Sequence, residues 1–287
     1  MKRSILFSAA CLGLISLVGC EKPAPEEAAK PEVKADAPAA EAPAPEAAKA
    51  PESKPAAKAP APATPPKAPA PEAAPKKAAP AAANTLTDAE KAEGWALLFN
   101  GKDMSNFRNY KKEGVNEKWV VKDGAITLTE KGGGDIVTKE QYGAFEIKFD
   151  YKISPAGNSG FMYHVTETEG TPWKTGPEVQ IQDNVDGHDP QKAGWLYQLY
   201  PATVDATNPA GEWNTLHVII TPEKCEHYMN GTKYCEYVKG SADWDAKVAA
   251  SKFSAFENFG KPTKGHINFQ DHGNVVSFRN LKIKSLD

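Results

Sequence analysis

The sequence predicts an all-β domain over residues 84–287, a sandwich of antiparallel strands with one or two short helices. Residues 145–153 alternate apolar and charged side chains, which is the pattern of a strand with one buried face. Residues 216–220 repeat this alternation. Breaks rich in glycine and asparagine, at 132–134 and 157–158, separate such runs, as turns do between the short strands of a sandwich.

The chain begins with features of an export signal. Basic residues stand at positions 2–3, and the apolar run over 5–18 that follows is too short for a stable membrane span. This pattern is typical of a signal peptide over residues 1–19. The residues Leu-Val-Gly-Cys at 17–20 are similar to a lipoprotein cleavage site, so we expect acyl chains on Cys20. The predicted location is the cell envelope, facing the periplasm or the exterior, with the membrane contacted through the lipid anchor only.

Residues 20–83 are predicted to form a disordered tether after this anchor. They consist almost wholly of Ala, Pro, Lys and Glu, and they contain no aromatic residue that a core would need. Their prolines favour extended segments. Positive and negative charges nearly balance in this stretch, and the whole chain has a net charge of −3. We therefore expect no nucleic acid partner.

Two helices and one hairpin are predicted within the domain. Thr87 and Glu90 have the spacing of a capping box, which indicates a short helix before residue 94, and a second helix is expected over 241–253. Asn230 and Gly231 separate two strand-like runs, which predicts a β-hairpin.

The length of this turn decides how two cysteines meet. A three-residue loop over 229–231 places Cys225 opposite Cys235, close enough to bond in an oxidising compartment. A two-residue turn leaves the pair diagonal and both thiols free. We predict the disulfide.

Acid and amide side chains alternate with apolar ones over residues 178–182. A strand there places Glu178, Gln180 and Gln182 on one face. Such a row is expected on a sugar-binding sheet, and the alternative is an exposed sheet surface without function. Asp183 follows directly.

A second polar row precedes the C-terminal strand. His266, Asn268, Gln270 and His272 share one strand face. For His266 and Asn268 we expect hydrogen bonding at the strand end. His272 offers a proton shuttle near neutral pH, and Arg279 offers a cation for a developing oxyanion.

A third group lies around the acid strand. A glycine-framed turn at 157–160 leads into a run that contains Ser159 and Tyr163. Aromatic side chains that stack on sugar rings, or alternatively belong to the core, are Trp173, Trp195 and Tyr197.

In order along the chain, these stretches resemble the 3-keto-disaccharide hydrolase family, whose domain is a concanavalin A-like jelly roll. The resemblance spans nearly the entire domain. The matching segments are 97–104 (LLFNGKDM), 135–139 (DIVTK), 142–146 (YGAFE), 158–160 (NSG), 178–183 (EVQIQD), 211–214 (GEWN), 251–253 (SKF) and 276–283 (VSFRNLKI).

The resemblance implies cleavage of glycosides already oxidised at the third sugar carbon, by elimination and hydration or by net hydrolysis. Such a reaction needs a base, an acid for the leaving oxygen and a stabiliser for the enolate. We expect Glu178 or Asp183 to act as the base and His272 as the acid. No cofactor is identified, but a divalent metal held by one of these carboxylates or by a histidine is an alternative stabiliser.

Contacts to the keto sugar are expected from a wider set of polar and aromatic side chains. These are Ser159, Tyr163, Gln180, Trp195, Tyr197, Gln270 and Arg279. Two other functions fit the same residues. One is a carbohydrate-binding lipoprotein without catalysis, because this fold also serves lectins. The other is ordinary glycoside hydrolysis, which calls for two carboxylates across one cleft. Glu178 and Asp183 are five apart in sequence and fall on opposite faces unless the strand has ended, which disfavours this alternative.

Overall fold

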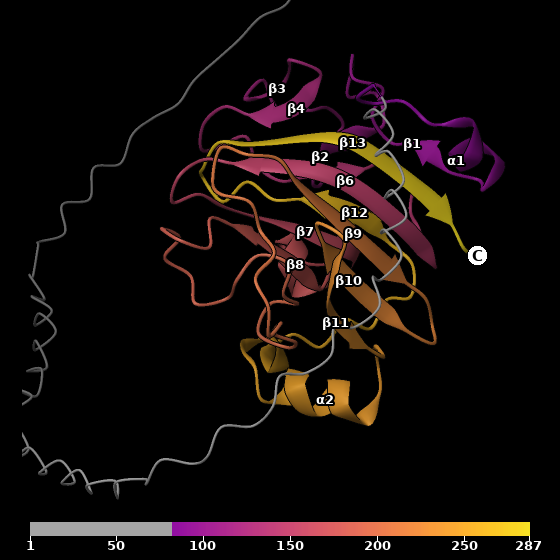
Figure 1. Ribbon diagram of the computed structural model, residues 1–287. Coiled ribbons are helices and arrows are strands. Elements are labelled where there is room, and N and C mark those ends of the chain that lie inside the picture. Colours follow the sequence, from indigo (N-terminus) through magenta and orange to yellow (C-terminus); the bar gives the residue numbers. More distant parts are fainter. Residues whose placement is uncertain (1–81) are drawn as a thin grey trace, which may run out of the picture. The chain divides into compact units, whose positions relative to one another are not determined.

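The computed structural model describes residues 82–287, in which two antiparallel sheets pack face to face (Figure 1). The predicted signal peptide, the Cys20 anchor and the tether as far as residue 81 lie outside the described residues. The larger sheet has the order β11-β10-β9-β6-β13-β4-β3, with β1 beside β13, and the smaller has the order β2-β5-β12-β7-β8.

The strands of the larger sheet are β1 (Ala96–Leu97), β3 (Trp119–Lys122), β4 (Ala125–Leu128), β6 (Phe145–Ile153), β9 (Asn214–Ile220), β10 (Cys225–Met229), β11 (Thr232–Tyr237) and β13 (Val276–Ser285). Those of the smaller sheet are β2 (Phe107–Asn109), β5 (Ile136–Thr138), β7 (Asn158–Val165), β8 (Glu178–Gln182) and β12 (His266–Phe269). The helices are α1 (Asp88–Ala92), α2 (Ala242–Ala249), η1 (Pro172–Lys174) and η2 (Lys252–Ala255).

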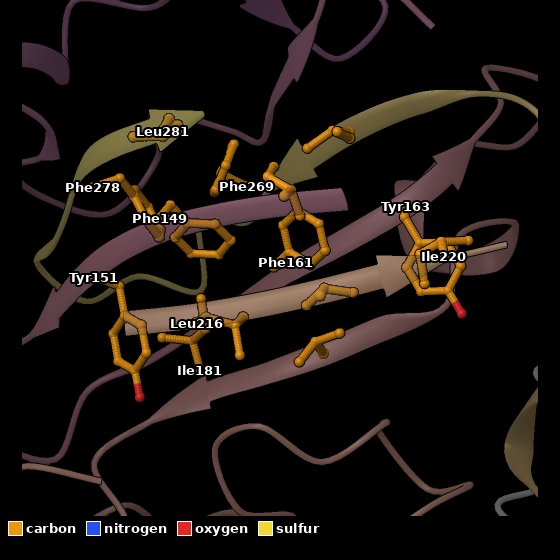
Figure 2. Close-up of a cluster of buried hydrophobic side chains, with 14 of the residues drawn as sticks. Phe149, Tyr151, Phe161, Tyr163, Ile181, Leu216, Ile220, Phe269, Phe278 and Leu281 are labelled. Carbon is orange, nitrogen blue, oxygen red and sulfur yellow. The ribbon is translucent and has the colours of Figure 1, made fainter. Parts of the chain in front are cut away.

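The core lies between the two sheets and combines aromatic rings with aliphatic side chains (Figure 2). The alternation in β6 is confirmed, because its odd-numbered apolar residues are buried and its charged residues face outward. Phe149 of the larger sheet packs against Phe161 and Phe269 of the smaller sheet, with ring centroids 5.3 Å apart in each case. Burial of these rings on both inner faces holds the sheets together.

The first helix forms as predicted, and the second is shorter. Thr87 and Glu90 make the reciprocal bonds of a capping box at α1. The expected helix over 241–253 is divided instead into α2 and η2, because the Ser251 side chain accepts a hydrogen bond from the backbone of Phe253 and begins a new turn. No helix within residues 82–287 is long and apolar enough to cross a membrane.

The predicted disulfide is wrong. The hairpin turn has two residues, since Met229 pairs with Thr232 and the residues between them have positive φ. A register shift before Tyr228 then sets Cys225 opposite Tyr237 and Cys235 opposite His227. The cysteines are therefore diagonal neighbours, and both thiols are free. Burial raises the pKa of Cys225 to about 11 and that of Cys235 to about 12, which keeps both thiols protonated.

Candidate functional site

The candidate site lies on the outward face of the smaller sheet. Val179 and Ile181 of β8 are in the core, so Glu178, Gln180 and Gln182 point to the opposite face, as predicted. β7 lies between β8 and β12, with Gly160 opposite Gln180. A cavity of about 440 Å³ opens over these strands. Its lining residues are Asp135, Asn158, Thr171, Pro172, Trp173, Glu178, Gln180, Asp189, Tyr197, Lys252, Gln270, Asp271 and His272.

Glu178 lies at the floor of the cavity. Its side chain is buried, and its carboxyl rests against Gly160, where a Cβ atom would overlap it. A glycine is therefore needed at position 160 for the carboxyl to fit. Burial raises the pKa of Glu178 to about 8; Lys252 opposes this shift, and the neighbouring Asp135 and Asp189 add to it. At neutral pH the Glu178 carboxyl holds a proton and is a hydrogen-bond donor.

Asp135 and Asp271 form a second acidic group at one wall. Asp135 accepts hydrogen bonds from the side chain of Asn268 (3.1 Å) and from the backbone of Asp271 (3.0 Å). Asp271 in turn accepts from the backbone of Gly132 and Gly134, at 2.9 and 2.8 Å. Burial raises the pKa of Asp135 to about 6, although these hydrogen bonds oppose the shift. Asp135 is therefore mostly ionised at neutral pH.

The opposite wall is aromatic. The ammonium of Lys252 lies 5.4 Å from the ring centroid of Trp173 and 4.4 Å from that of Tyr197. The hydroxyl of Tyr197 donates to Asp189 at 2.8 Å. Lys252 and His272 are themselves exposed, so they stand at the rim. The site thus has a buried acid and amide floor beneath an aromatic and cationic rim.

Several buried oxygen atoms around the floor have no hydrogen-bond partner within residues 82–287. They belong to Asn158, Thr171, Gln180, Gln182, Asn268 and Gln270. The orientation of the Gln180 and Gln182 amides is fixed, because their nitrogens donate to the backbone carbonyl of Gln191, at 3.3 and 2.7 Å, and a carbonyl only accepts. The amide oxygens are consequently free to accept hydrogen bonds. Because buried polar atoms normally have partners, we expect a ligand to donate to them.

The structure brings together five of the predicted site residues, namely Glu178, Gln180, Tyr197, Gln270 and His272. Trp195 instead lines a shallow neighbouring hollow with Gln191 and Gln198. The hydrogen bonding expected of His266 is present, because its Nδ1 donates to the carbonyl of Thr138 at 2.7 Å.

Four other predicted residues do not reach the cavity. Ser159 and Tyr163 fall on the inward face of β7, where the Ser159 hydroxyl donates to the Gln270 carbonyl at 2.8 Å and the Tyr163 hydroxyl lies 2.7 Å from that of Tyr237. Asp183 accepts from the backbone of Ala156 and Val185, each at 3.0 Å, and so shapes a loop.

Arg279 is the fourth, and it belongs to β13 in the other sheet. It pairs with Asp150 at 3.3 Å and stacks on Trp213, with its guanidinium carbon 4.0 Å from the ring centroid. These contacts correct the expected roles of Ser159, Tyr163, Asp183 and Arg279.

Six polar or charged lining residues were absent from the predicted set: Asp135, Asn158, Thr171, Asp189, Lys252 and Asp271. Most lie in loops, where no periodic pattern marks a face. The glycine run before Asp135 was a usable signal, because it supplies the backbone donors that hold Asp271 beside it. No group of three or more His, Cys, Asp or Glu side chains within residues 82–287 is placed to hold a metal ion, and the divalent metal stays a prediction.

The two antiparallel sheets and the cavity on one of them define a concanavalin A-like jelly-roll protein, which confirms the predicted fold. The chain belongs to the family of 3-keto-alpha-glucoside-1,2-lyase-like domains, whose family model matches residues 94–284. It is 32% identical over 232 residues to a 3-keto-disaccharide hydrolase of Bacteroides thetaiotaomicron, covering 68% of this chain and 80% of that protein.

Two solved structures from Parabacteroides distasonis ATCC 8503, each described as a proposed glycosyl hydrolase, are similar to the chain. The first has 40% identity and a TM-score of 0.67, and the match covers 71% of this chain and 100% of the other. The second has 29% identity and a TM-score of 0.53, and the match covers 67% and 99%.

Proposed function

We propose that the protein cleaves 3-keto-glycosides in the cavity over β7, β8 and β12. Family membership and the similarity to a 3-keto-disaccharide hydrolase support this proposal. The observation that carries it is the Glu178 carboxyl, which lies buried at the floor of the cavity with a pKa of about 8. Such a group keeps a proton at neutral pH and delivers it to an oxygen atom that leaves.

The reaction follows from the chemistry of the ketone. A carbonyl at the third sugar carbon acidifies the hydrogen on the second carbon, so a base removes that proton and an enolate forms. The bond between the first carbon and the glycosidic oxygen then breaks, and the oxygen takes a proton from an acid. Addition of water across the resulting double bond returns the free 3-keto sugar and restores the proton balance.

Asp135 and Glu178 divide these two proton transfers in our proposal. With a pKa of about 6, Asp135 is ionised at neutral pH and serves as the base. With a pKa of about 8, Glu178 is protonated and serves as the acid. This assignment revises the expectation from sequence that Glu178 or Asp183 is the base and His272 the acid. Two carboxyl groups in one cavity whose pKa values lie on either side of neutrality form a suitable acid and base pair.

The remaining lining groups hold the substrate. Among the residues that the structure describes, Lys252 is the only Lys or Arg whose side chain lines the cavity, and we assign it to the developing enolate oxygen. The oxygens of Gln180 and Gln270 accept hydrogen bonds from sugar hydroxyls. Trp173 and Tyr197 offer flat apolar surfaces for a sugar ring. His272 contacts the leaving group from the rim.

The test is turnover of 3-keto-trehalose by the wild type and by Glu178→Gln. Glutamine has nearly the same shape but no proton to transfer, so we expect kcat/KM to fall by about 10²-fold or more. Glu223→Gln is the control, because this exposed carboxyl lies between β9 and β10 in the other sheet. Wild-type turnover by Glu178→Gln contradicts the assignment of the acid.

Two further arms of this experiment address the alternatives. Unoxidised trehalose is expected to give no product, since elimination needs the ketone, and cleavage of trehalose itself would instead indicate ordinary glycoside hydrolysis. Binding of 3-keto-trehalose by the wild type without product would indicate a carbohydrate-binding protein. Loss of wild-type turnover on treatment with a chelator would indicate a divalent metal.

A further inference from the structure

The cavity carries several acidic groups that form no ion pair with another side chain within residues 82–287. Asp135, Glu178, Asp189 and Asp271 line it, and none of the four has a Lys, Arg or His nitrogen within 4.0 Å among residues 82–287. Their hydrogen bonds come from neutral donors, as at Asp271, which accepts from the backbone of Gly132 at 2.9 Å. Glu178 is protonated at neutral pH, so the negative charge of the site comes from Asp135, Asp189 and Asp271, although the chain as a whole has a net charge of only −3.

The single lysine of the site does not offset this charge. Lys252 is exposed at the rim, and its ammonium is directed at aromatic faces, 4.4 Å from the Tyr197 centroid and 5.3 Å from that of Phe253. An exposed charge is screened by water and salt, whereas charges in a partly buried cavity interact more strongly. The carboxylates of Asp135, Asp189 and Asp271 thus keep the cavity negative.

The neutral groups of the floor reinforce this preference. Amide oxygens with a fixed orientation, such as that of Gln180, whose nitrogen donates to the Gln191 carbonyl, have no partner within the described residues and can only accept. A sugar hydroxyl donates a hydrogen bond to such an oxygen. A carboxylate on a sugar has no hydrogen to donate, so it leaves these atoms unpartnered and brings a negative charge toward other negative charges.

We infer that the cavity selects neutral glycosides and rejects glycosides of acidic sugars such as uronic acids. This inference deepens the proposed function and rests on the same site. The negative charge of an acidic sugar, held about 10 Å from one unpaired carboxylate of the cavity, is repelled by it. At an effective dielectric constant of about 20, this repulsion weakens binding of the sugar more than tenfold. The rejection therefore needs no steric block, and a neutral derivative of the same shape as the acid is accepted.

The experiment compares a matched pair of ligands. The 3-keto forms of 4-nitrophenyl glucuronamide and 4-nitrophenyl glucuronate differ by an amide in place of a carboxylate, with nearly the same size. We expect the amide to have a kcat/KM within about threefold of the 3-keto-glucoside, and the acid to be more than tenfold worse at low ionic strength. Equal rates for acid and amide overturn the inference, and rejection of both shows a steric cause and overturns it too.

A variant locates the origin of the effect. Asp189→Asn keeps an oxygen that accepts from Tyr197 but removes one charge, so the ratio of acid to amide turnover is expected to rise about threefold or more. Glu223→Gln removes one charge from the surface of the other sheet and leaves the ratio unchanged. An unchanged ratio in Asp189→Asn contradicts the inference.

Calorimetric binding of the two unoxidised ligands separates this inference from the proposed function. If the wild type turns over none of the 3-keto compounds, the proposed function fails, and the affinities still decide the inference. We expect a Kd for the glucuronamide more than tenfold below that for the glucuronate. Equal affinities, or no binding of either ligand at millimolar concentration, overturn the inference.

Discussion

Asp135 and Glu178, the proposed base and acid, predict a bell-shaped dependence of kcat/KM on pH. Activity on a 3-keto-glycoside rises as Asp135 loses its proton, with a pKa of about 6, and falls as Glu178 loses its proton, with a pKa of about 8. The maximum is expected near pH 7. At pH 5 only about a tenth of Asp135 is ionised, and at pH 9 only about a tenth of Glu178 is protonated, so kcat/KM falls about tenfold at each limit.

The assay is the initial rate of product release at substrate concentrations far below KM, in buffers of constant ionic strength from pH 5 to 9. Because kcat/KM reports the free enzyme, the limbs belong to the unliganded carboxyl groups. The negative charge of Asp135 is one cause of the raised pKa of Glu178, so Asp135→Asn should move the alkaline limb of its residual activity to lower pH. A flat profile, or an alkaline limb that persists unchanged in Glu178→Gln, refutes the division of roles.

Four further predictions concern stability, packing and location. Because the pKa of Glu178 in the folded state is above its ordinary value of 4.5, the stability of the wild type falls by up to about 5 kcal/mol as pH rises from about 4.5 to 8. Glu178→Gln does not undergo this loss, so its melting temperature relative to that of the wild type should increase from pH 5 to pH 9. A constant difference in melting temperature would contradict the raised pKa. Gly160→Ala should displace the Glu178 carboxyl and lower kcat/KM at least tenfold with the circular dichroism spectrum unchanged; full activity would show that the carboxyl does not need this space. Alkylation in denaturant without reductant should label both Cys225 and Cys235 in peptide maps, and a pair that reacts only after reduction would restore the disulfide. Cys20→Ser should abolish labelling with radioactive palmitate and release the protein from membranes, and continued labelling would exclude Cys20 as the anchor.

Strand periodicity predicted the part of the site that lies within one strand. The order of side chains over 178–182 placed Glu178 and Gln180 on the outward face without any knowledge of neighbouring strands. The same rule, applied to β7, places Ser159 and Tyr163 with Phe161 on the inward face. This inward position excludes the expected sugar contacts, because polar residue type alone does not decide which face of a strand a side chain occupies.

Local sequence patterns do not predict contacts between segments that are far apart in the chain. Asp135 and Asp189 come from two separate loops and Lys252 from the start of η2, and only the tertiary fold brings them to one cavity. Arg279 comes soon after the polar row of residues 266–272 in the sequence. It lies in β13, however, and β13 belongs to the other sheet. The register shift before Tyr228 likewise depends on pairing between β10 and β11. This shift places Cys225 and Cys235 diagonally, so they do not face each other.

The most direct test of the account is a crystal structure of Glu178→Gln with an uncleaved 3-keto-disaccharide. The account predicts the keto sugar in the cavity over β7, β8 and β12, with its hydroxyls donating to the oxygens of Gln180 and Gln270 and its second carbon facing Asp135. A disaccharide bound on another surface, with this cavity holding only water, would contradict it.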